Sequence, residues 1–131
     1  MSREHGADKR LIAGHLAYVR FAVAHPALFR LMFHSSHVNR ATARVRLAGD
    51  AAFATLRQAV ADVRGSTHQP IRAPEAWRDP SLLGQWSLVH GLATLAMEGQ
   101  FGPNPTRKSV IASIRAALDL SVATLSDRRR N

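Results

Sequence analysis

The sequence predicts a single all-α domain with five helices. Its 131 residues suffice for one hydrophobic core and are too few for two. Five segments repeat apolar residues at the three- and four-residue spacing of an α-helix, and no segment shows a convincing strand alternation. Proline and glycine stand between these segments, where helices commonly end or begin.

The first two helices are predicted on either side of a His-Pro step. Residues 7–24 place Leu16 and Val19 on one apolar face, as expected of a helix that packs on a core. Pro26 interrupts this helix, because the residue before a proline is disfavoured in the helical region. The same proline suits the first turn of a short apolar helix over residues 26–33, PALFRLMF.

The third helix is predicted over residues 39–64. Its apolar stripe includes Leu56 and Val60, and charged residues occupy the other faces. Gly65 is suited to end it, because glycine readily adopts the left-handed conformation that closes many helices. Residues 65–79 are rich in proline and polar residues, so we expect a loop or linker there.

The last two helices are predicted over residues 80–100 and 106–127. Asp79 before Pro80 is a helix-start pattern, since aspartate is a favoured N-cap residue and proline a favoured first helical residue. Thr106 is placed to cap the last helix after the sequence GPNP.

Both of these helices are apolar or small on more than one face. A helix that is apolar all round is normally buried, and one small domain covers only one side of each terminal helix. We therefore predict a homodimer in which the last two helices of each copy form a four-helix bundle with two-fold symmetry. The predicted interface residues are Gly84, Ser87, Gly91, Thr94, Val110, Ser113, Ala117, Leu120 and Thr124. The alternative is a monomer whose 65–79 loop covers this face.

The composition excludes several classes of protein. There is no cysteine, which excludes disulfides, thiolate zinc sites and a cysteine nucleophile. The net charge of +9 suits an acidic partner such as nucleic acid, but the arginines are scattered, with one cluster at residues 128–130. A basic nucleic-acid-binding protein is thus an alternative. It predicts that this chain itself retains DNA with a steep dependence on salt, and we expect no such retention. No apolar run approaches the roughly 20 residues of a membrane span, so we expect a cytoplasmic protein and no membrane partner.

Catalysis is not expected from this sequence. His34 and His37 form a pair in HSSH, but a zinc site needs three or four ligands. Glu98 is an isolated acid in an apolar helix, and no nucleophile elbow or phosphate-binding glycine loop is present. We expect no enzyme, metal or cofactor.

Two sequence blocks resemble one class of regulatory domain. WSLVHG contains Trp86, His90 and Gly91, and YVRFAVAHPALFRLMF spans residues 18–33. Together they resemble the tryptophan–histidine–glycine class of C-terminal domains among TetR-type transcriptional regulators. The resemblance covers essentially the whole chain, 1–131. It implies an effector-binding domain that dimerises through its last two helices. In that family an N-terminal helix-turn-helix domain binds operator DNA, and only about six residues precede the first helix here. We therefore expect DNA binding to belong to a portion missing from this chain.

A small apolar or aromatic effector is expected on the apolar faces of the first four helices. The predicted ligand-binding residues are Leu16, Val19, Phe29, Met32, Phe33, Leu56, Val60, Trp86 and His90. An imidazole offers a ligand one hydrogen bond, but His90 can equally be satisfied by a backbone carbonyl or a serine of a neighbouring helix. The alternative function is a structural dimerisation module without a ligand. An enclosed apolar void of several hundred cubic ångströms beside Trp86 favours sensing.

Overall fold

The computed structural model describes residues 3–34, 43–65, 71 and 75–127. These residues form five α-helices and one short 3-10 helix, with no strand among them, which confirms the all-α class. The elements are α1 Arg3–Ala24, α2 Pro26–His34, α3 Ala43–Arg64, η1 Glu75–Arg78, α4 Pro80–Met97 and α5 Arg107–Asp127.

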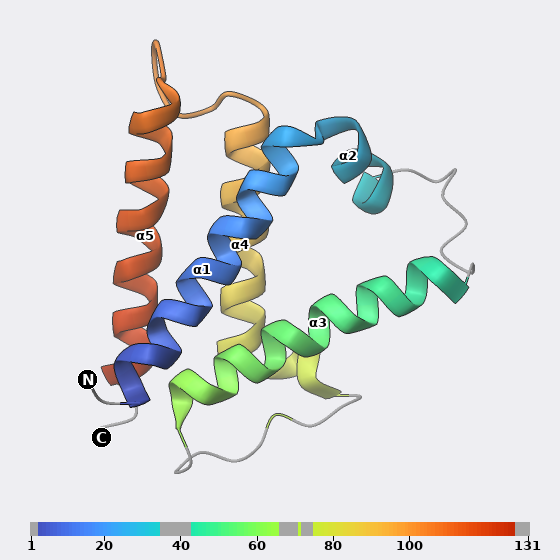
Figure 1. The fold of residues 1–131 in the computed structure, drawn as a ribbon, viewed down its shortest axis with the longest axis vertical. Helices are drawn as coiled ribbons and strands as arrows, with labels where there is room; N and C mark the ends of the chain where they lie inside the picture. The colour runs from blue at the N-terminus through green and yellow to red at the C-terminus, as the bar shows by residue number, and fades with distance from the viewer. Residues whose placement is uncertain (1–2, 35–42, 66–70, 72–74, 128–131) are drawn as a thin grey trace.

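Helix α1 is the centre of the arrangement. It packs on α3, α4 and α5, while α4 and α5 run antiparallel to each other behind it (Figure 1). The start of α1 and the end of α5 are joined by a 3.0 Å hydrogen bond from Ser126 Oγ to Asp8 Oδ1. At the other end of α1 the chain turns by 106° into α2, at the predicted His-Pro break. Because α1 packs on α3, α4 and α5, a pocket beside α1 is lined by residues that are far apart in the sequence.

Two predicted helix limits need correction. α1 begins at Arg3 rather than at residue 7, because REHG contains no proline and continues the helix by one more turn. α4 ends at Met97 rather than at residue 100, because Gly99 adopts a positive φ of 68° that closes the helix. The predicted loop 65–79 contains η1, and residues 39–42 of the predicted third helix lie outside the described residues.

The predicted helix caps are present in the structure. Asp79 Oδ1 accepts hydrogen bonds from the backbone N–H of Ser81 and of Leu82, at 3.0 and 3.1 Å. Its other oxygen accepts from Arg64 Nη1 at 2.8 Å, which ties the end of α3 to the start of α4. Thr106 and Ser109 cap α5 reciprocally, each side chain accepting the other residue's backbone N–H. Gly65 has a φ of 77° directly after α3, as expected of a helix-closing glycine.

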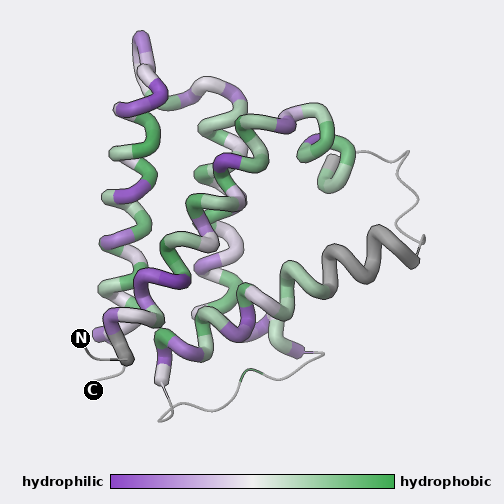
Figure 2. The backbone as a smooth tube through the Cα atoms, viewed as in Figure 1, coloured by the Kyte–Doolittle hydropathy of each residue, from purple (hydrophilic) through white to green (hydrophobic). Residues whose placement is uncertain are grey.

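The interior consists of two hydrophobic clusters that share α1, α4 and α5. One cluster adds α2 and includes Val19, Phe29 and Leu118. The other adds α3 and η1 and includes Val60 and Leu82. Hydrophobic residues recur along the described parts of all five helices (Figure 2). Because α1 contributes to both clusters, a shift of α1 along α4 has to repack both.

Helix α5 is apolar beyond what its core contacts require. Within the described residues, α5 alone and the bent α1–α2 pair are long and apolar enough to cross a bilayer, a test that core helices of soluble proteins also pass. One face of α5 is buried in the two clusters through Ile114, Leu118 and Val122. On another face Leu120 is 73% exposed, so part of the apolar surface of α5 has no cover within the described residues.

Candidate functional site

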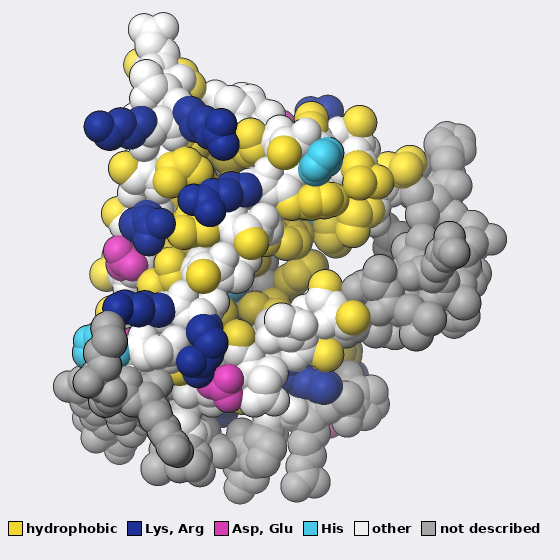
Figure 3. Space-filling model, viewed as in Figure 1, with side chains coloured by type: hydrophobic (Ala, Val, Ile, Leu, Met, Phe, Trp, Pro, Cys, Tyr) yellow, Lys and Arg dark blue, Asp and Glu magenta, His cyan; other side chains and the backbone are white. Residues whose placement is uncertain are grey.

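A cavity of about 310 Å³ lies between α1, α3 and α4. We call it the α1–α3–α4 cavity. Its apolar wall includes Leu11 and Val89 opposite Leu56, and its polar groups include His15 and Thr55. Hydrophobic side chains are visible in the hollow between α1 and α3 (Figure 3). The volume falls at the lower end of the range that small-molecule sites occupy, roughly 300 to 1,000 Å³.

An aromatic cluster surrounds His90 behind one wall of this cavity. His90 Nδ1 and the Tyr18 hydroxyl oxygen form a hydrogen bond of 2.8 Å. The imidazole stacks on Phe29 and on Trp86, with ring centroids 5.3 and 5.9 Å away, and meets the edge of Phe33 at 4.9 Å. The cluster thus joins α1, α2 and α4, and it is where the two sequence blocks that resemble the regulatory family meet.

Tyr18 and Trp86 belong to both the cluster and the cavity wall. Both side chains line the cavity, whereas His90 is not among its lining residues. Burial raises the pKa of Tyr18, so its phenol keeps its proton throughout the physiological range. One partner of His90 is the hydroxyl of Tyr18 on α1, a contact that the sequence did not predict. His90 therefore does not line the cavity itself, but it holds in place two side chains that do, Tyr18 through the hydrogen bond and Trp86 through ring stacking.

A second polar chain crosses the bundle through α1, α4 and α5. His15 Nε2 donates to Gln85 Oε1 at 2.8 Å, and Gln85 Nε2 donates to Ser121 Oγ at 2.8 Å. His15 and Gln85 are buried, at 3% and 5% exposure. Burial lowers the pKa of His15 below its ordinary value of 6.5, with the Gln85 hydrogen bond acting in the opposite direction. His15 is consequently a neutral imidazole that donates from Nε2 at neutral pH.

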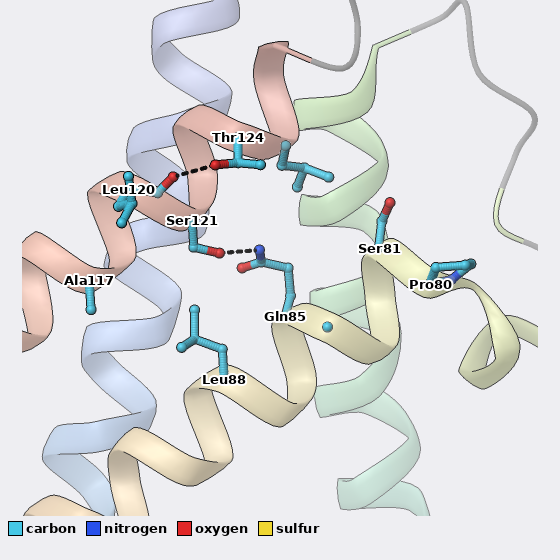
Figure 4. A pocket seen from close by; sticks show the side chains of 10 residues that line it. Pro80, Ser81, Gln85, Leu88, Ala117, Leu120, Ser121 and Thr124 are labelled. Carbon is cyan, nitrogen blue, oxygen red and sulfur yellow. Dashed lines mark hydrogen bonds between the residues drawn. The ribbon is translucent and has the colours of Figure 1, made fainter.

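Gln85 and Ser121 open onto a groove on the far side of the bundle. This α4–α5 groove has a volume of about 590 Å³ (Figure 4). Figure 4 shows the side chain of Gln85 reaching Ser121 across the groove, with Leu88 and Ala117 beside them. The chain His15–Gln85–Ser121 thus runs from the wall of the α1–α3–α4 cavity to the wall of the α4–α5 groove.

The predicted dimer residues fall into two groups. Those that line the α4–α5 groove are Gly84, Ala117, Leu120 and Thr124. Outside its lining, Ser87 and Ser113 are exposed, and Gly91, Thr94 and Val110 are half-buried. A Cβ atom added to Gly84 or to Gly91 would meet no atom within 4 Å, so no contact within the described residues explains either glycine.

The predicted ligand residues lie in four places. Leu56 and Trp86 line the cavity. Leu16, Val19, Phe29 and Val60 are buried in the hydrophobic clusters, and Phe33 and His90 stand in the aromatic cluster. Met32 is 39% exposed on α2.

Sequence reasoning missed the polar side chains that connect the helices, namely Tyr18, Gln85 and Ser121. The sequence does contain a pattern that predicts such contacts: a polar residue on an otherwise apolar stripe must find a hydrogen-bond partner when it is buried. His15 occupies such a position on α1, between Ile12 and Val19. The identity of its partner, 70 residues away in the chain, could not be predicted from that pattern.

The residues considered for catalysis do not form a cluster in the part of the chain that the structure describes. No group of three or more His, Asp or Glu side chains there could hold a metal ion. Glu98 is exposed at the C-cap of α4, and His37 lies outside the described residues.

Comparison with known proteins assigns the family. The family described as "Tetracyclin repressor-like, C-terminal domain" matches residues 11–120, a range that contains the aromatic cluster, the cavity lining except Arg10, and most of α5. No curated protein and no solved structure matches the chain. The match covers more than half of the chain, and the five-helix fold agrees with it. The chain therefore belongs to the tetracyclin repressor-like C-terminal domain family.

Proposed function

We propose that this chain is the effector-sensing and dimerisation domain of a TetR-like transcriptional regulator that acts in the cytoplasm. The effector is a small apolar or aromatic molecule, and operator DNA is bound by a helix-turn-helix domain that is not among these residues. The observation that carries the proposal is the cavity of about 310 Å³ with Trp86 in its wall, within a chain of this family.

The chemistry of the cavity wall supports an aromatic effector with one polar group. The Trp86 indole offers a flat apolar surface, and offset stacking on it favours an aromatic ring. Because His15 donates from Nε2 to Gln85, its Nδ1 is the acceptor nitrogen. Nδ1 has no partner among the described residues, so it can accept from a hydroxyl or N–H of the ligand. Such a mixture of apolar walls and few polar groups is typical of small-molecule sites.

A second copy of the chain is the proposed occupant of the α4–α5 groove. Leu120 is 73% exposed there, and a Cβ atom added to Gly84 in the same groove would meet no atom of the described residues within 4 Å. Glycine inside an exposed helix costs about 1 kcal/mol relative to alanine, so its presence favours a close approach by another backbone. Two copies related by a two-fold axis would bury this face against itself.

The polar chain His15–Gln85–Ser121 supplies a route between the two sites. A ligand that bonds His15 acts on α1 at the point where α1 is held to α4. In the intact regulator, the position of α1 would set the spacing of two DNA-binding heads. A ligand shifts that equilibrium only through unequal affinity for the two arrangements. Equal effector affinity with and without operator DNA, measured on the intact regulator, would contradict this coupling.

Ligand binding is tested on the 131-residue chain with toluene and naphthalene as probes. Trp77→Phe removes the exposed indole and leaves Trp86 as the sole tryptophan, so its emission reports on the cavity. We expect the emission of Trp86 to change on titration with either probe. Ala59→Phe in this background fills the cavity and should abolish the change. Ala51→Phe places the same ring on the exposed side of α3 and is the matched control.

Dimerisation is tested by sedimentation velocity at micromolar concentration. We expect Leu120→Glu to convert the dimer to monomers, because it places a charge in the groove that the second copy would cover. Leu28→Glu changes an equally apolar exposed residue on α2 and should leave the dimer intact. A wild-type chain that sediments as a monomer contradicts the dimer. A dimer that binds neither probe identifies the chain as a structural dimerisation module.

A further inference from the structure

We propose a second ligand site, for an amphipathic anion, at the end of the bundle opposite the start of α4. A cavity of about 400 Å³ lies there between the last turns of α1, the α4–α5 connection and the first turns of α5. We call it the α1–α5 cavity. It shares no lining residue with the α1–α3–α4 cavity or with the α4–α5 groove, so this inference is independent of the proposed function.

The walls of the α1–α5 cavity are apolar. Val23 comes from α1, Phe101 and Pro105 from the connection, and Val110 and Ile111 from α5. Val23 is 51% exposed although it is a β-branched hydrocarbon side chain, so apolar surface is open to a ligand there. Burying such surface stabilises a complex by about 25 cal/mol per Å² removed from water.

Two arginines complete the lining of this cavity. Arg20 projects from α1 and Arg107 from the first turn of α5. Neither forms an ion pair or hydrogen bond with a described residue, and no carboxylate lines the cavity. Glu98, which caps α4 nearby, is exposed and is not part of the lining. Two arginines without a partner among the described residues therefore line a pocket whose other walls are mostly hydrocarbon, with Thr106 as a further polar residue.

This combination selects a single-chain amphiphile with a carboxylate head. The planar guanidinium of arginine matches a carboxylate in a two-bond geometry, which an ammonium cannot do. At roughly 30 Å³ for each non-hydrogen atom, the share of a water molecule in the liquid, the cavity holds about a dozen such atoms. A carboxylate with a chain of medium length fits both the charge and the volume.

Isothermal titration calorimetry of the 131-residue chain tests the site with octanoate, 1-octanol and acetate. Octanoate is expected to bind at least about tenfold more tightly than 1-octanol, which lacks the charge, and acetate, which lacks the tail. The double variant Arg20→Gln/Arg107→Gln should weaken octanoate about tenfold or more and leave 1-octanol unchanged. Arg20→Lys/Arg107→Lys should retain part of the affinity. Arg115→Gln changes an exposed arginine elsewhere on α5 and should have no effect.

Two further variants identify the cavity that is occupied. Val23→Trp fills the α1–α5 cavity from an exposed position and should abolish octanoate binding without lowering the melting temperature. Ala59→Phe fills the other cavity and should leave octanoate binding unchanged while it abolishes toluene binding. Three results would overturn the proposal: no heat of octanoate binding in the wild type, equal affinity for octanoate and 1-octanol, or loss of octanoate binding in Ala59→Phe with retention in Val23→Trp.

Discussion

The imidazole of His15 and the carboxamide of Gln85 are joined by a buried hydrogen bond of 2.8 Å between α1 and α4. Gln85 passes the interaction on to Ser121 of α5 by a second bond of the same length. A primary amide is one of the few side chains that accepts on one atom and donates on another, so it can join two polar groups at once. Through Gln85, the wall of the α1–α3–α4 cavity is physically connected to the α4–α5 groove.

Replacing Gln85 should destabilise the domain much more than replacing an exposed glutamine. Gln85→Ala leaves buried His15 and half-buried Ser121 without this partner, and an unsatisfied buried group such as His15 costs about 1–3 kcal/mol. Gln58 is exposed on α3, where it bonds Asp62, so Gln58→Ala should stay within about 0.5 kcal/mol. Urea titrations followed by circular dichroism give both free energies of unfolding. Equal losses in the two variants would contradict a structural role for the polar chain.

The stability of the domain should fall as the pH drops through the range just below 6.5. Because burial lowers the pKa of His15 in the folded state, the unfolded chain binds more protons there than the folded one. The contribution of neutral His15 is complete above pH 6.5 and is lost progressively down to its folded pKa. Unfolding free energies measured from pH 8 to pH 5 should show this slope in the wild type and a reduced slope in His15→Gln. His25→Gln, at an exposed position, should keep the wild-type slope.

Gly84→Ala should separate the stability of one subunit from self-association. Alanine stabilises a helix by about 1 kcal/mol relative to glycine, and the new Cβ meets no atom of the described residues within 4 Å. We expect a monomer at least as stable as the wild type and a weaker dimer, because the partner backbone loses its close approach. Gly14→Ala is the control, since Gly14 has the same open space but lies on α1 and does not line the α4–α5 groove. Sedimentation equilibrium that shows equal dimer affinity in both variants would contradict a close helix contact at Gly84.

The aromatic cluster should depend on ring packing more than on its hydrogen bond. Tyr18→Phe keeps the ring but removes the hydroxyl bonded to His90, with an expected loss of about 1 kcal/mol. Phe29→Ala empties a fully buried position and should cost about 3–5 kcal/mol. Trp77→Phe, at an exposed ring of η1, should change little. Thermal melts of the three variants check this order, and a larger effect of Tyr18→Phe than of Phe29→Ala would contradict it.

Local chemistry explains which parts of the fold were predictable. Gly65, Asp79 and Thr106 act within a few residues of themselves, so their roles as helix ends are confirmed by φ angles and short hydrogen bonds. The end of α4 was placed three residues too late because the positive φ of Gly99 outweighs the apolar pattern that continues past it. The resemblance to the family was likewise seen in two short blocks of sequence, and both lie within the residues 11–120 that the family match covers.

The sequence by itself determined five helices, their breaks, and the family, because periodicity, capping and proline act over a few residues and leave their pattern in the chain. The tertiary structure alone decided that His90 meets Tyr18 and that His15 meets Gln85, pairs 72 and 70 residues apart. Such contacts depend on how α1 crosses α4, and the crossing is set by the packing of two hydrophobic clusters at once. No local pattern encodes that geometry. The α1–α3–α4 cavity, the α1–α5 cavity and the polar chain His15–Gln85–Ser121 therefore follow only from the assembled helices.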